Sequence, residues 1–326
     1  MEFIGIDVSK KKLDCLWLKD PVANKVKSRV LPNTPAGHRQ VIEWACKQTG
    51  RALEALHFVM EATGVYHEAL AYALFDAGAR VSVVNPARIQ AYARARTTRG
   101  KTDKKDSIAI ARYGYAEQPA LWQPEAAEIR RLKALMRRLE ALEKSIQQEE
   151  NRLEKSTTSQ DDAVVIASIQ SVLLSLKAEK KRLEDLINDH IDSHPGLKQD
   201  KALLESIPGV GEVVARYMMT LFRSRNFERA GQMAAFVGLV PIERESGSSV
   251  RGRPRLSKAG SATIRAKLYL PAVVTTRFNP QIRDLYQRLI ARGKSKMAAI
   301  GAAMRKLVHM CFGVLKHQQP YSPMAA

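Results

Sequence analysis

Two stretches in the middle of the chain repeat an apolar residue at every third or fourth position, except where Glu149 and Lys180 take the place of one. The first stretch has Leu132, Leu135, Leu139, Leu142, Ile146 and Leu153, and the second has Ile166, Ile169, Leu173, Leu176, Leu183 and Ile187. This spacing gives each helix one apolar face and is typical of coiled coils. Because only the polar segment 156–162 separates the stretches, we expect two long helices that form an antiparallel coiled-coil hairpin or that pair between two chains.

An arm of this kind divides the chain into parts that fold on either side of it. The chain has 326 residues, of which 45% are hydrophobic, and this is enough for two or three packed cores. We expect a first domain at residues 1–122, a coiled-coil arm for spacing and assembly at 123–196, and a C-terminal domain at 197–326.

The first domain alternates strand patterns with helix patterns. Strand-like apolar runs occupy 3–7, 12–18, 27–33, 55–64 and 80–85, and helix-like runs occupy 34–48, 66–79, a segment opened by Pro86, and 102–116. The order is a strand hairpin, then helix, strand, helix, strand and helix, which predicts an α/β layer structure with a mixed sheet.

The C-terminal domain is expected to be mainly α-helical. Near its start, two apolar helical halves flank the sequence Pro208-Gly209-Val210-Gly211, which is the pattern of a helix-hairpin-helix motif. The tight turn of that motif directs backbone N–H groups at a phosphate and reads no base, so Pro208, Gly209 and Gly211 are candidate nucleic-acid contacts. A plain turn between two helices of a bundle explains the same residues, and the sequence leaves both interpretations open.

Positive charge is concentrated in the C-terminal part. The formal net charge is +20, and the segment from Lys201 onward has 21 Lys and Arg against 6 Asp and Glu, or +15. A surplus of this size repels itself in the folded state and is typical of proteins that bind a polyanion, most often DNA or RNA. A basic protein kept in solution by its charge is the alternative.

Cysteine, histidine and hydropathy patterns exclude several classes of protein. Cys15, Cys46 and Cys311 are far apart and odd in number, and no histidines pair at metal-ligand spacing, so we expect free thiols in a reducing cytoplasm and no zinc site. No apolar run approaches the roughly 18 residues of a membrane span, and the N-terminus lacks the order of a signal peptide. We therefore expect no membrane partner.

Four carboxylates in the first domain form a candidate metal site. Asp7 and Glu61 each end an apolar strand, and Asp103 and Asp106 are three residues apart on one expected helix. An all-oxygen set of ligands suits Mg²⁺ or Mn²⁺, and two such ions roughly 4 Å apart can support phosphodiester chemistry. Alternatively, Asp103 is only a helix N-cap and Asp106 only a favourable first-turn acid.

Several motifs together resemble one protein family. They are "GIDVSKKKLD", "EATGVY", "VNPARIQAYARARTTRGKTDKKDSIAIA", "ESIPGVG" and "AAFVGLVPIERESGSSVRGRPRLSKAG". The chain is similar to the DEDD-type insertion-sequence transposases, whose first domain is similar to the RuvC Holliday-junction resolvase. The resemblance implies an RNase H-like (RuvC-like) fold for the first domain, with Asp7, Glu61, Asp103 and Asp106 as the Mg²⁺-binding acids.

The same resemblance assigns a role to the segment 243–260, which is rich in serine, glycine and basic residues. By composition this segment is either a flexible linker or a loop that brings a serine to a phosphate. The family pattern maps a catalytic nucleophile onto Ser246, rather than onto Ser248 or Ser249. The expected phosphate-binding side chains of this loop are Arg244, Arg251, Arg253, Arg255 and Lys258.

The resemblance also implies partners and an activity. It implies a composite site in which the acids of one subunit meet Ser246 of another, a homo-oligomer of two to four chains, and a structured guide RNA that pairs with donor and target DNA. We expect a bacterial cytoplasmic recombinase, associated with the nucleoid when bound to DNA, that rejoins strands through a serine-phosphate link. The alternatives are a RuvC-like junction nuclease that uses metal-activated water, and a non-catalytic nucleic-acid scaffold.

Overall fold

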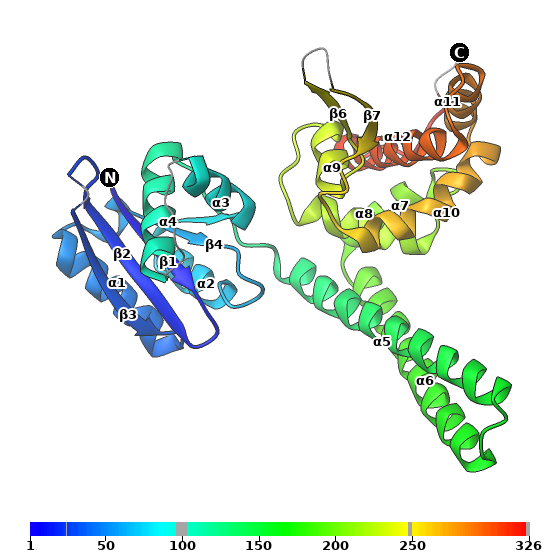
Figure 1. Ribbon diagram of the computed structural model, residues 1–326, viewed down its shortest axis with the longest axis horizontal. Coiled ribbons are helices and arrows are strands. Elements are labelled where there is room, and N and C mark those ends of the chain that lie inside the picture. Colours follow the sequence, from blue (N-terminus) through cyan, green and yellow to red (C-terminus); the bar gives the residue numbers. More distant parts are fainter. Residues whose placement is uncertain (24, 96–102, 247–249, 324–326) are drawn as a thin grey trace. The chain divides into compact units, whose positions relative to one another are not determined.

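The structure is a computed structural model that describes residues 1–23, 25–95, 103–246 and 250–323. For 103–105, 243–246 and 250–254 it describes only the backbone. The chain forms two compact units, Met1–Pro124 and Glu125–Ala326, whose elements are labelled in Figure 1.

The N-terminal unit is built on a five-stranded mixed sheet. Its strands are β1 (Glu2–Val8), β2 (Lys12–Asp20), β3 (Lys25–Pro32), β4 (Leu56–Glu61) and β5 (Arg80–Val84). The order is β3-β2-β1-β4-β5, with β1, β2 and β3 antiparallel and with β4 parallel to both β1 and β5. The predicted α/β fold with a mixed sheet is therefore confirmed.

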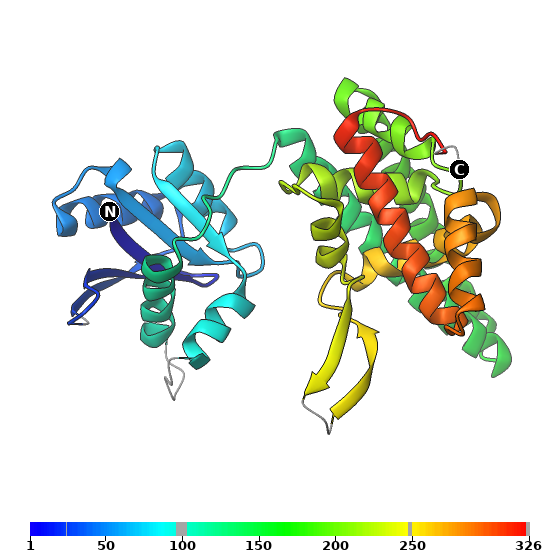
Figure 2. The ribbon, with the colours of Figure 1, turned by 90° about the horizontal axis from the view of Figure 1, so that it is seen from above.

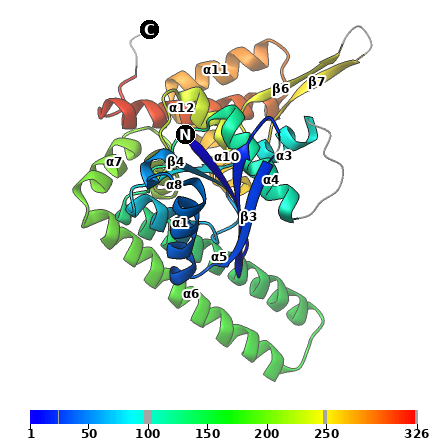
Figure 3. The same cartoon turned by 90° about the vertical axis from the view of Figure 1, so that its left-hand side faces the viewer.

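Helices cover both faces of this sheet (Figure 3). The helices α1 (Pro35–Thr49) and α2 (Glu68–Asp76) pack on the face that carries Ile4 and Ile6, while α3 (Pro86–Ala95) and α4 (Asp103–Glu117) pack on the face that carries Phe3 and Val59. A short 3₁₀ helix, η1 (Leu53–Ala55), precedes β4. The strands between the helices are thus buried on both faces, which explains their continuous apolar runs.

A long helical hairpin begins the second unit. The helices α5 (Ala127–Thr158) and α6 (Ala163–Asp192) lie side by side in Figure 1. They run antiparallel, because Nε2 of His190 near the end of α6 is 2.8 Å from the carbonyl oxygen of Glu128 near the start of α5. The two predicted long helices are confirmed, while the coiled-coil packing and the assembly role of the arm stay predictions.

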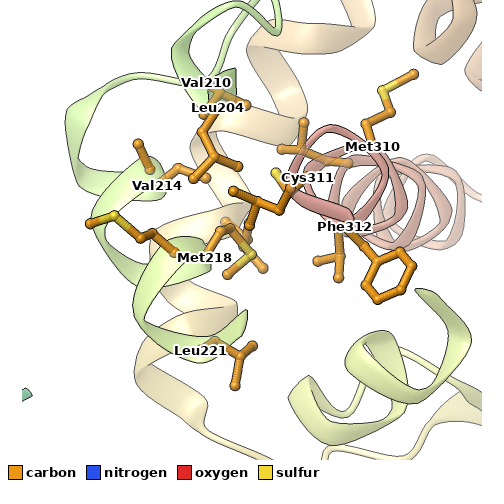
Figure 4. Packing of buried hydrophobic residues seen from close by; sticks show 14 of the residues in the cluster. Leu204, Val210, Val214, Met218, Leu221, Met310, Cys311 and Phe312 are labelled. Atoms are coloured by element: carbon orange, nitrogen blue, oxygen red, sulfur yellow. The ribbon is translucent and has the colours of Figure 1, made fainter. Parts of the chain in front are cut away.

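The remainder of the second unit is mainly helical, as expected. Its elements are α7 (Pro195–Glu205), α8 (Glu212–Arg223), α9 (Ala230–Val237), β6 (Pro241–Ser246), β7 (Val250–Leu256), α10 (Ala262–Phe278), α11 (Pro280–Ala291) and α12 (Lys296–His317). Figure 2 shows α12 as the long red helix, and it contacts all five other helices of this group. Figure 4 shows one part of this core, where Met218 of α8 and Cys311 of α12 pack together.

The expectation that no segment approaches a membrane span is wrong for α12. This helix is, by length and hydropathy alone, the one candidate span among the described residues, with a mean hydropathy of 1.4. Its apolar composition has a different cause, because 61% of the candidate stretch is buried inside the unit. The central helix of a bundle is apolar on most of its surface for this reason.

The three cysteines are free thiols, as predicted. Burial raises the pKa of Cys15 and of Cys311 to about 12, so neither side chain is a reactive thiolate at neutral pH.

The basic segment 243–260 was expected to lack regular structure, and this expectation is wrong. The strands β6 and β7 form an antiparallel ribbon that pairs Pro241 with Leu256 and Ser246 with Val250. Gly252 and Pro254 lie inside β7. Both strands of a two-stranded ribbon are edge strands, where a proline without an N–H group is tolerated.

Candidate catalytic acid site

Asp7 and Glu61 lie beside each other at one edge of the sheet. The parallel pairing of β1 with β4 matches Gly5 to Val59 and Ile6 to Met60, and Asp7 and Glu61 are the next residue on each strand. Neighbouring strands are about 5 Å apart, and matched residues project on the same face. Both side chains are half-buried. The structure therefore brings together the two strand-end acids that the sequence analysis selected.

A glycine lets α4 pack directly on β1. A Cβ atom on Gly5 would lie 2.5 Å from both the carbonyl oxygen of Ser107 and the amide nitrogen of Ala111. Farther along α4, a Cβ atom on Gly114 would lie 2.6 Å from Cγ2 of Val59. Only glycine at these two positions permits so close an approach.

The direction of α4 follows from the same contacts. Gly114 lies near Phe3, and Ser107 lies near Gly5, two residues farther along β1. From Phe3 to Gly5, the contacts of β1 move from the end of α4 toward its start. The next residue of β1 on the face that α4 covers is Asp7. The first turn of α4 is therefore at the sheet edge where β1 and β4 end.

The other two predicted acids are in that first turn. Asp103 is the first residue of α4, and its side chain lies outside the described residues. Asp106 is half-buried and lies one helical turn before Ile110, which packs in a cluster with Phe3 and Val59. All four acids thus belong to elements that meet at one edge of the sheet.

The donor chemistry of these acids suits a hard cation, because carboxylate oxygens are the ligands that Mg²⁺ prefers. Among the described side chains, no three His, Cys, Asp or Glu residues form a group that could hold a metal ion. This finding covers the side chains of Asp7, Glu61 and Asp106. It does not cover Asp103, whose side chain lies outside the described residues.

Sequence reasoning missed two charged residues at this edge, Lys12 and Asp14. The antiparallel register of β1 with β2 places Asp14 directly opposite Asp7. Nζ of Lys12 is 3.2 Å from Oδ2 of Asp14. The available signal was the alternation along β2, because Leu16 and Leu18 pack against Ala111 of α4 and residues two positions apart share a face.

A tight turn fixes this register. The Ser9 hydroxyl donates to the carbonyl oxygen of Lys12 at 2.9 Å and accepts from the Lys12 amide at 3.2 Å. Ser9 follows Asp7 by two residues. The turn Ser9-Lys10-Lys11 of the first strand hairpin therefore holds β1 and β2 in the pairing that sets Asp14 against Asp7.

The predicted nucleophile Ser246 is the last residue of β6. Its side chain lies outside the described residues, as do those of Arg244, Arg251 and Arg253, and Ser248 and Ser249 lie outside them entirely. Arg255 and Lys258 are exposed. The base of the ribbon is anchored on the end of α9, since the Lys258 amide donates to the carbonyl oxygen of Gly238 at 3.2 Å.

The predicted helix-hairpin-helix turn connects α7 to α8. Gly209 has φ of +90°, and a Cβ atom there would lie 2.5 Å from Cγ2 of Thr275 in α10, so glycine is required by both the backbone and the packing. Gly211 is the N-cap of α8, which has no side-chain cap, and Pro208 is half-buried. These features suit a bundle turn and a phosphate-binding turn equally, so both interpretations stay open.

Two family models match the sequence. Residues 4–159 match one described as "Transposase", and residues 201–287 match one described as "Transposase IS116/IS110/IS902 family".

Individual proteins are similar over long stretches. The pilin gene-inverting protein of Moraxella bovis is 30% identical over 322 residues, which are 98% of this chain and 97% of that protein. The insertion element IS110 uncharacterized 43.6 kDa protein of Streptomyces coelicolor is 28% identical over 154 residues, which are 47% of this chain and 37% of that protein. Among solved structures, T. thermophilus RuvC in complex with a Holliday junction substrate matches 37% of this chain and 98% of its own, at 19% identity and a TM-score of only 0.27.

Proposed function

The chain belongs to the IS116/IS110/IS902 family of transposases and is a DNA transposase, and we propose that it cuts and rejoins DNA strands through a covalent link between Ser246 and a DNA phosphate, with a divalent metal ion at the acid site. The similar protein of Moraxella bovis is named for inverting a pilin gene. By analogy, the DNA substrate is a pair of double-stranded sites, a donor and a target, whose strands are exchanged.

The observation that supports this proposal most directly is the edge of the sheet where Asp7 and Glu61 lie side by side and where α4 begins. Asp7, Glu61, Asp103 and Asp106 would hold Mg²⁺, with Mn²⁺ as the second choice. Such an ion supplies charge neutralisation and Lewis-acid polarisation to phosphodiester chemistry. The carboxylates of Asp7 and Glu61 lie on neighbouring strands and repel one another without a cation, which supports a cation-binding role for this edge.

The covalent step is a transesterification. The Ser246 oxygen bonds to a DNA phosphorus as one bridging P–O bond of the strand breaks, and the proton that the serine gives up ends on the departing hydroxyl. The number of phosphoester bonds is unchanged. A hydroxyl of another strand then attacks the serine-linked phosphorus in the reverse sense and restores the serine. A serine hydroxyl is a weak nucleophile and needs a base or a metal to activate it.

Positive charge around Ser246 is proposed to orient the phosphate. In the ribbon, Arg244 pairs with Gly252 and Arg251 pairs with Glu245, so both arginines lie within two positions of the pair formed by Ser246 and Val250. Arginine binds phosphate through two parallel hydrogen bonds. The ribbon also carries Arg253 and Arg255, and Lys258 follows it.

The backbone of Pro208, Gly209 and Gly211 is proposed to contact a DNA phosphate elsewhere on the same unit. The charge of +15 from Lys201 onward is compatible with binding both RNA and DNA. We therefore include a structured guide RNA among the partners, as the family resemblance implies.

Assembly is part of the proposal. The acids belong to the N-terminal unit and Ser246 to the second unit. We propose that acids of one chain act with Ser246 of another in a homo-oligomer of two to four chains, and that the hairpin of α5 and α6 mediates the association. We further propose that the protein acts in the bacterial cytoplasm, at the nucleoid.

The test is to trap the covalent adduct. Full-length protein is mixed with duplex DNA that carries donor and target sites, with the RNA that co-purifies with it and with Mg²⁺, and is then denatured and digested with protease. We expect mass spectrometry to find a nucleotide on Ser246. The adduct should be lost in Ser246→Ala and kept in the matched controls Ser248→Ala and Ser249→Ala.

Other outcomes separate the alternatives. An adduct on Ser248 or Ser249, or one that persists in Ser246→Ala, contradicts the assignment. Cleaved strands without any adduct indicate a nuclease that uses metal-activated water. DNA binding without cleavage, unchanged in Asp7→Asn, indicates a scaffold.

A further inference from the structure

A groove of about 710 Å³ lies between α1 and α2, on the sheet face opposite to α4. Every residue that lines it belongs to the N-terminal unit and is described. Lys10 and Arg39 line it together with two tyrosines, Tyr66 and Tyr72. Nothing in the acid site requires this groove.

The rim of the groove is built on the turns that follow the candidate acids. The Asn33 side-chain amide donates to the carbonyl oxygens of Ser9 at 2.9 Å and of Tyr66 at 3.0 Å. Ser9 comes two residues after Asp7, and Tyr66 comes five residues after Glu61. One side chain thus ties together the two loops that leave the acid site.

His38 completes this network. Its Nε2 is 2.8 Å from Oδ1 of Asn33, and burial lowers the pKa of His38, which keeps the ring neutral with one N–H to donate. Both N–H groups of the Asn33 side-chain amide and its carbonyl oxygen then have hydrogen-bond partners. The rim is therefore pre-formed, which favours a binding site over a chance depression between helices.

The walls of the groove combine apolar surface with aromatic rings. Ile42, Ala69 and Ala73 supply aliphatic surface. Tyr66 is 41% exposed. The Tyr72 ring is held edge-on against Trp122 with centroids 4.9 Å apart. Flat, apolar surfaces of this kind accept the faces of unpaired bases, whereas a duplex keeps those faces stacked inside.

The basic and acidic side chains that line the groove belong to different elements. Lys10 and Arg39 are exposed, and neither side chain is in a salt bridge with any of the described residues. Lys10 belongs to the turn after β1 and Arg39 to the first turns of α1, whereas the acid of the groove, Asp76, ends α2. Cations beside aromatic rings are the combination that binds single-stranded nucleic acid.

We propose that this groove binds an unpaired DNA strand at the same edge of the sheet as the acids but on the opposite face, with bases against Tyr66 and Tyr72 and phosphates beside Lys10 and Arg39. The identification of the strand as DNA rests on the proposed function. The preference for unpaired bases rests on the groove alone. Strand exchange requires DNA whose bases are separated from their partners, and the groove holds such a strand where it leaves the acids.

The experiment is site-resolved photocrosslinking of the full-length protein to short single-stranded DNA that carries 5-iodouracil. We expect crosslinked peptides that contain Tyr66 or Tyr72. At subsaturating DNA, Tyr66→Ala should lower the crosslink yield in the groove by about 5-fold to 100-fold, as expected for the loss of one base stack, while Tyr66→Phe keeps it. Both changes leave the backbone contact to Asn33 in place, so the fold should be preserved.

The charge is tested with a matched pair of variants. Arg39→Ala should lower the groove yield, and Arg51→Ala, which removes the same charge just beyond the other end of α1, should not. Crosslinks confined to Glu125–Ala326, a groove that captures duplex DNA as well as single strands, or a groove that captures only RNA would each overturn the proposal. Asp7→Asn should keep the groove crosslinks, so a failure of the acid chemistry is distinguishable from a failure of the groove.

Discussion

Asp7 and Asp14 lie directly opposite each other on the antiparallel strands β1 and β2, and Lys12 binds the second of them at 3.2 Å. Opposite residues of an antiparallel pair have Cα atoms about 4.5–5.5 Å apart. Two carboxylates in this position destabilise the sheet, and a nearby ammonium group offsets their repulsion. We infer that Lys12 is a positioning residue, which would hold Asp7 and Asp14 side by side while no metal ion is bound.

This relationship predicts a metal-dependent stability effect. Lys12→Met should lower the free energy of unfolding by about 1 kcal/mol without divalent ions, and less in saturating Mg²⁺. Asp14→Asn should raise it slightly without metal, because one of the two facing charges is removed. Thermal unfolding with and without Mg²⁺ measures both effects.

The matched control is Lys11→Met, which removes an exposed lysine from the same turn. If Lys12→Met and Lys11→Met behave alike at every Mg²⁺ concentration, then Lys12 has no special part in the charge balance of the acid site.

Gly5 gives a second prediction. In Gly5→Ala, the new methyl group meets the α4 backbone at 2.5 Å, so α4 must move away from β1 and carry the first-turn acids with it. We expect about 1–3 kcal/mol of lost stability. Strand exchange should fall far more than this loss explains at a temperature where the variant is fully folded.

Gly231→Ala is the control, since a Cβ atom there meets nothing within 4 Å. Retained strand exchange in folded Gly5→Ala would show that the close approach of α4 to β1 is dispensable for the chemistry.

The N-terminal unit should also be sensitive to acid. Burial, with the nearby positive charge of Arg80 as a smaller cause, lowers the pKa of His57 from 6.5 to about 4. The unfolded chain then binds a proton near pH 6.5 that the folded chain refuses until about pH 4, so stability is complete above pH 6.5 and is lost as the pH falls toward 4.

We expect His57 to contribute about 1–3 kcal/mol to this loss. Denaturant unfolding of the wild type and of His57→Gln at pH 7 and pH 5 measures it. The variant should be less stable at pH 7, because the ring hydrogen-bonds Ser82 at 2.8 Å, but its stability should change less between the two pH values. Equal pH dependence in both proteins would exclude His57 as the cause.

The elements of the N-terminal unit could be predicted because local patterns determine them. Thr34 signals the start of α1, and its hydroxyl accepts from the Gly37 amide at 3.2 Å as a capping residue does. Asp7 and Glu61 could be selected because an ionisable residue at the end of an apolar strand is conspicuous.

The parts that were missed depend on pairing between distant residues or on conflicting local signals. Asp14 faces Asp7 only through the register of β1 with β2, which no single strand reveals. The ribbon of β6 and β7 was missed because serines, Gly252 and Pro254 read as loop signals, and these outweigh the alternation of arginine along 250–256. The groove between α1 and α2 requires Asn33 to join two loops, which is a tertiary contact.

The arm allows a last prediction, on which residue of the helical hairpin tests assembly. Leu173 is only 5% exposed and is buried within the hairpin, so Leu173→Asp, like Leu139→Asp, would damage the fold of one chain whether or not chains associate. Leu174 is 73% exposed on the same helix. A second chain that covers it would bury an apolar side chain that the single chain leaves in water.

We therefore expect Leu174→Asp to keep the helical content and the unfolding transition of a diluted sample, while light scattering shows a smaller particle. A charge placed in an apolar contact should weaken association by about 2 kcal/mol or more, which is roughly a thirtyfold change in the dissociation constant. Gln148→Asp adds the same charge at an exposed position of α5 and should leave the mass unchanged. If Leu174→Asp and Gln148→Asp have the wild-type mass at every concentration, this face of α6 does not hold the chains together.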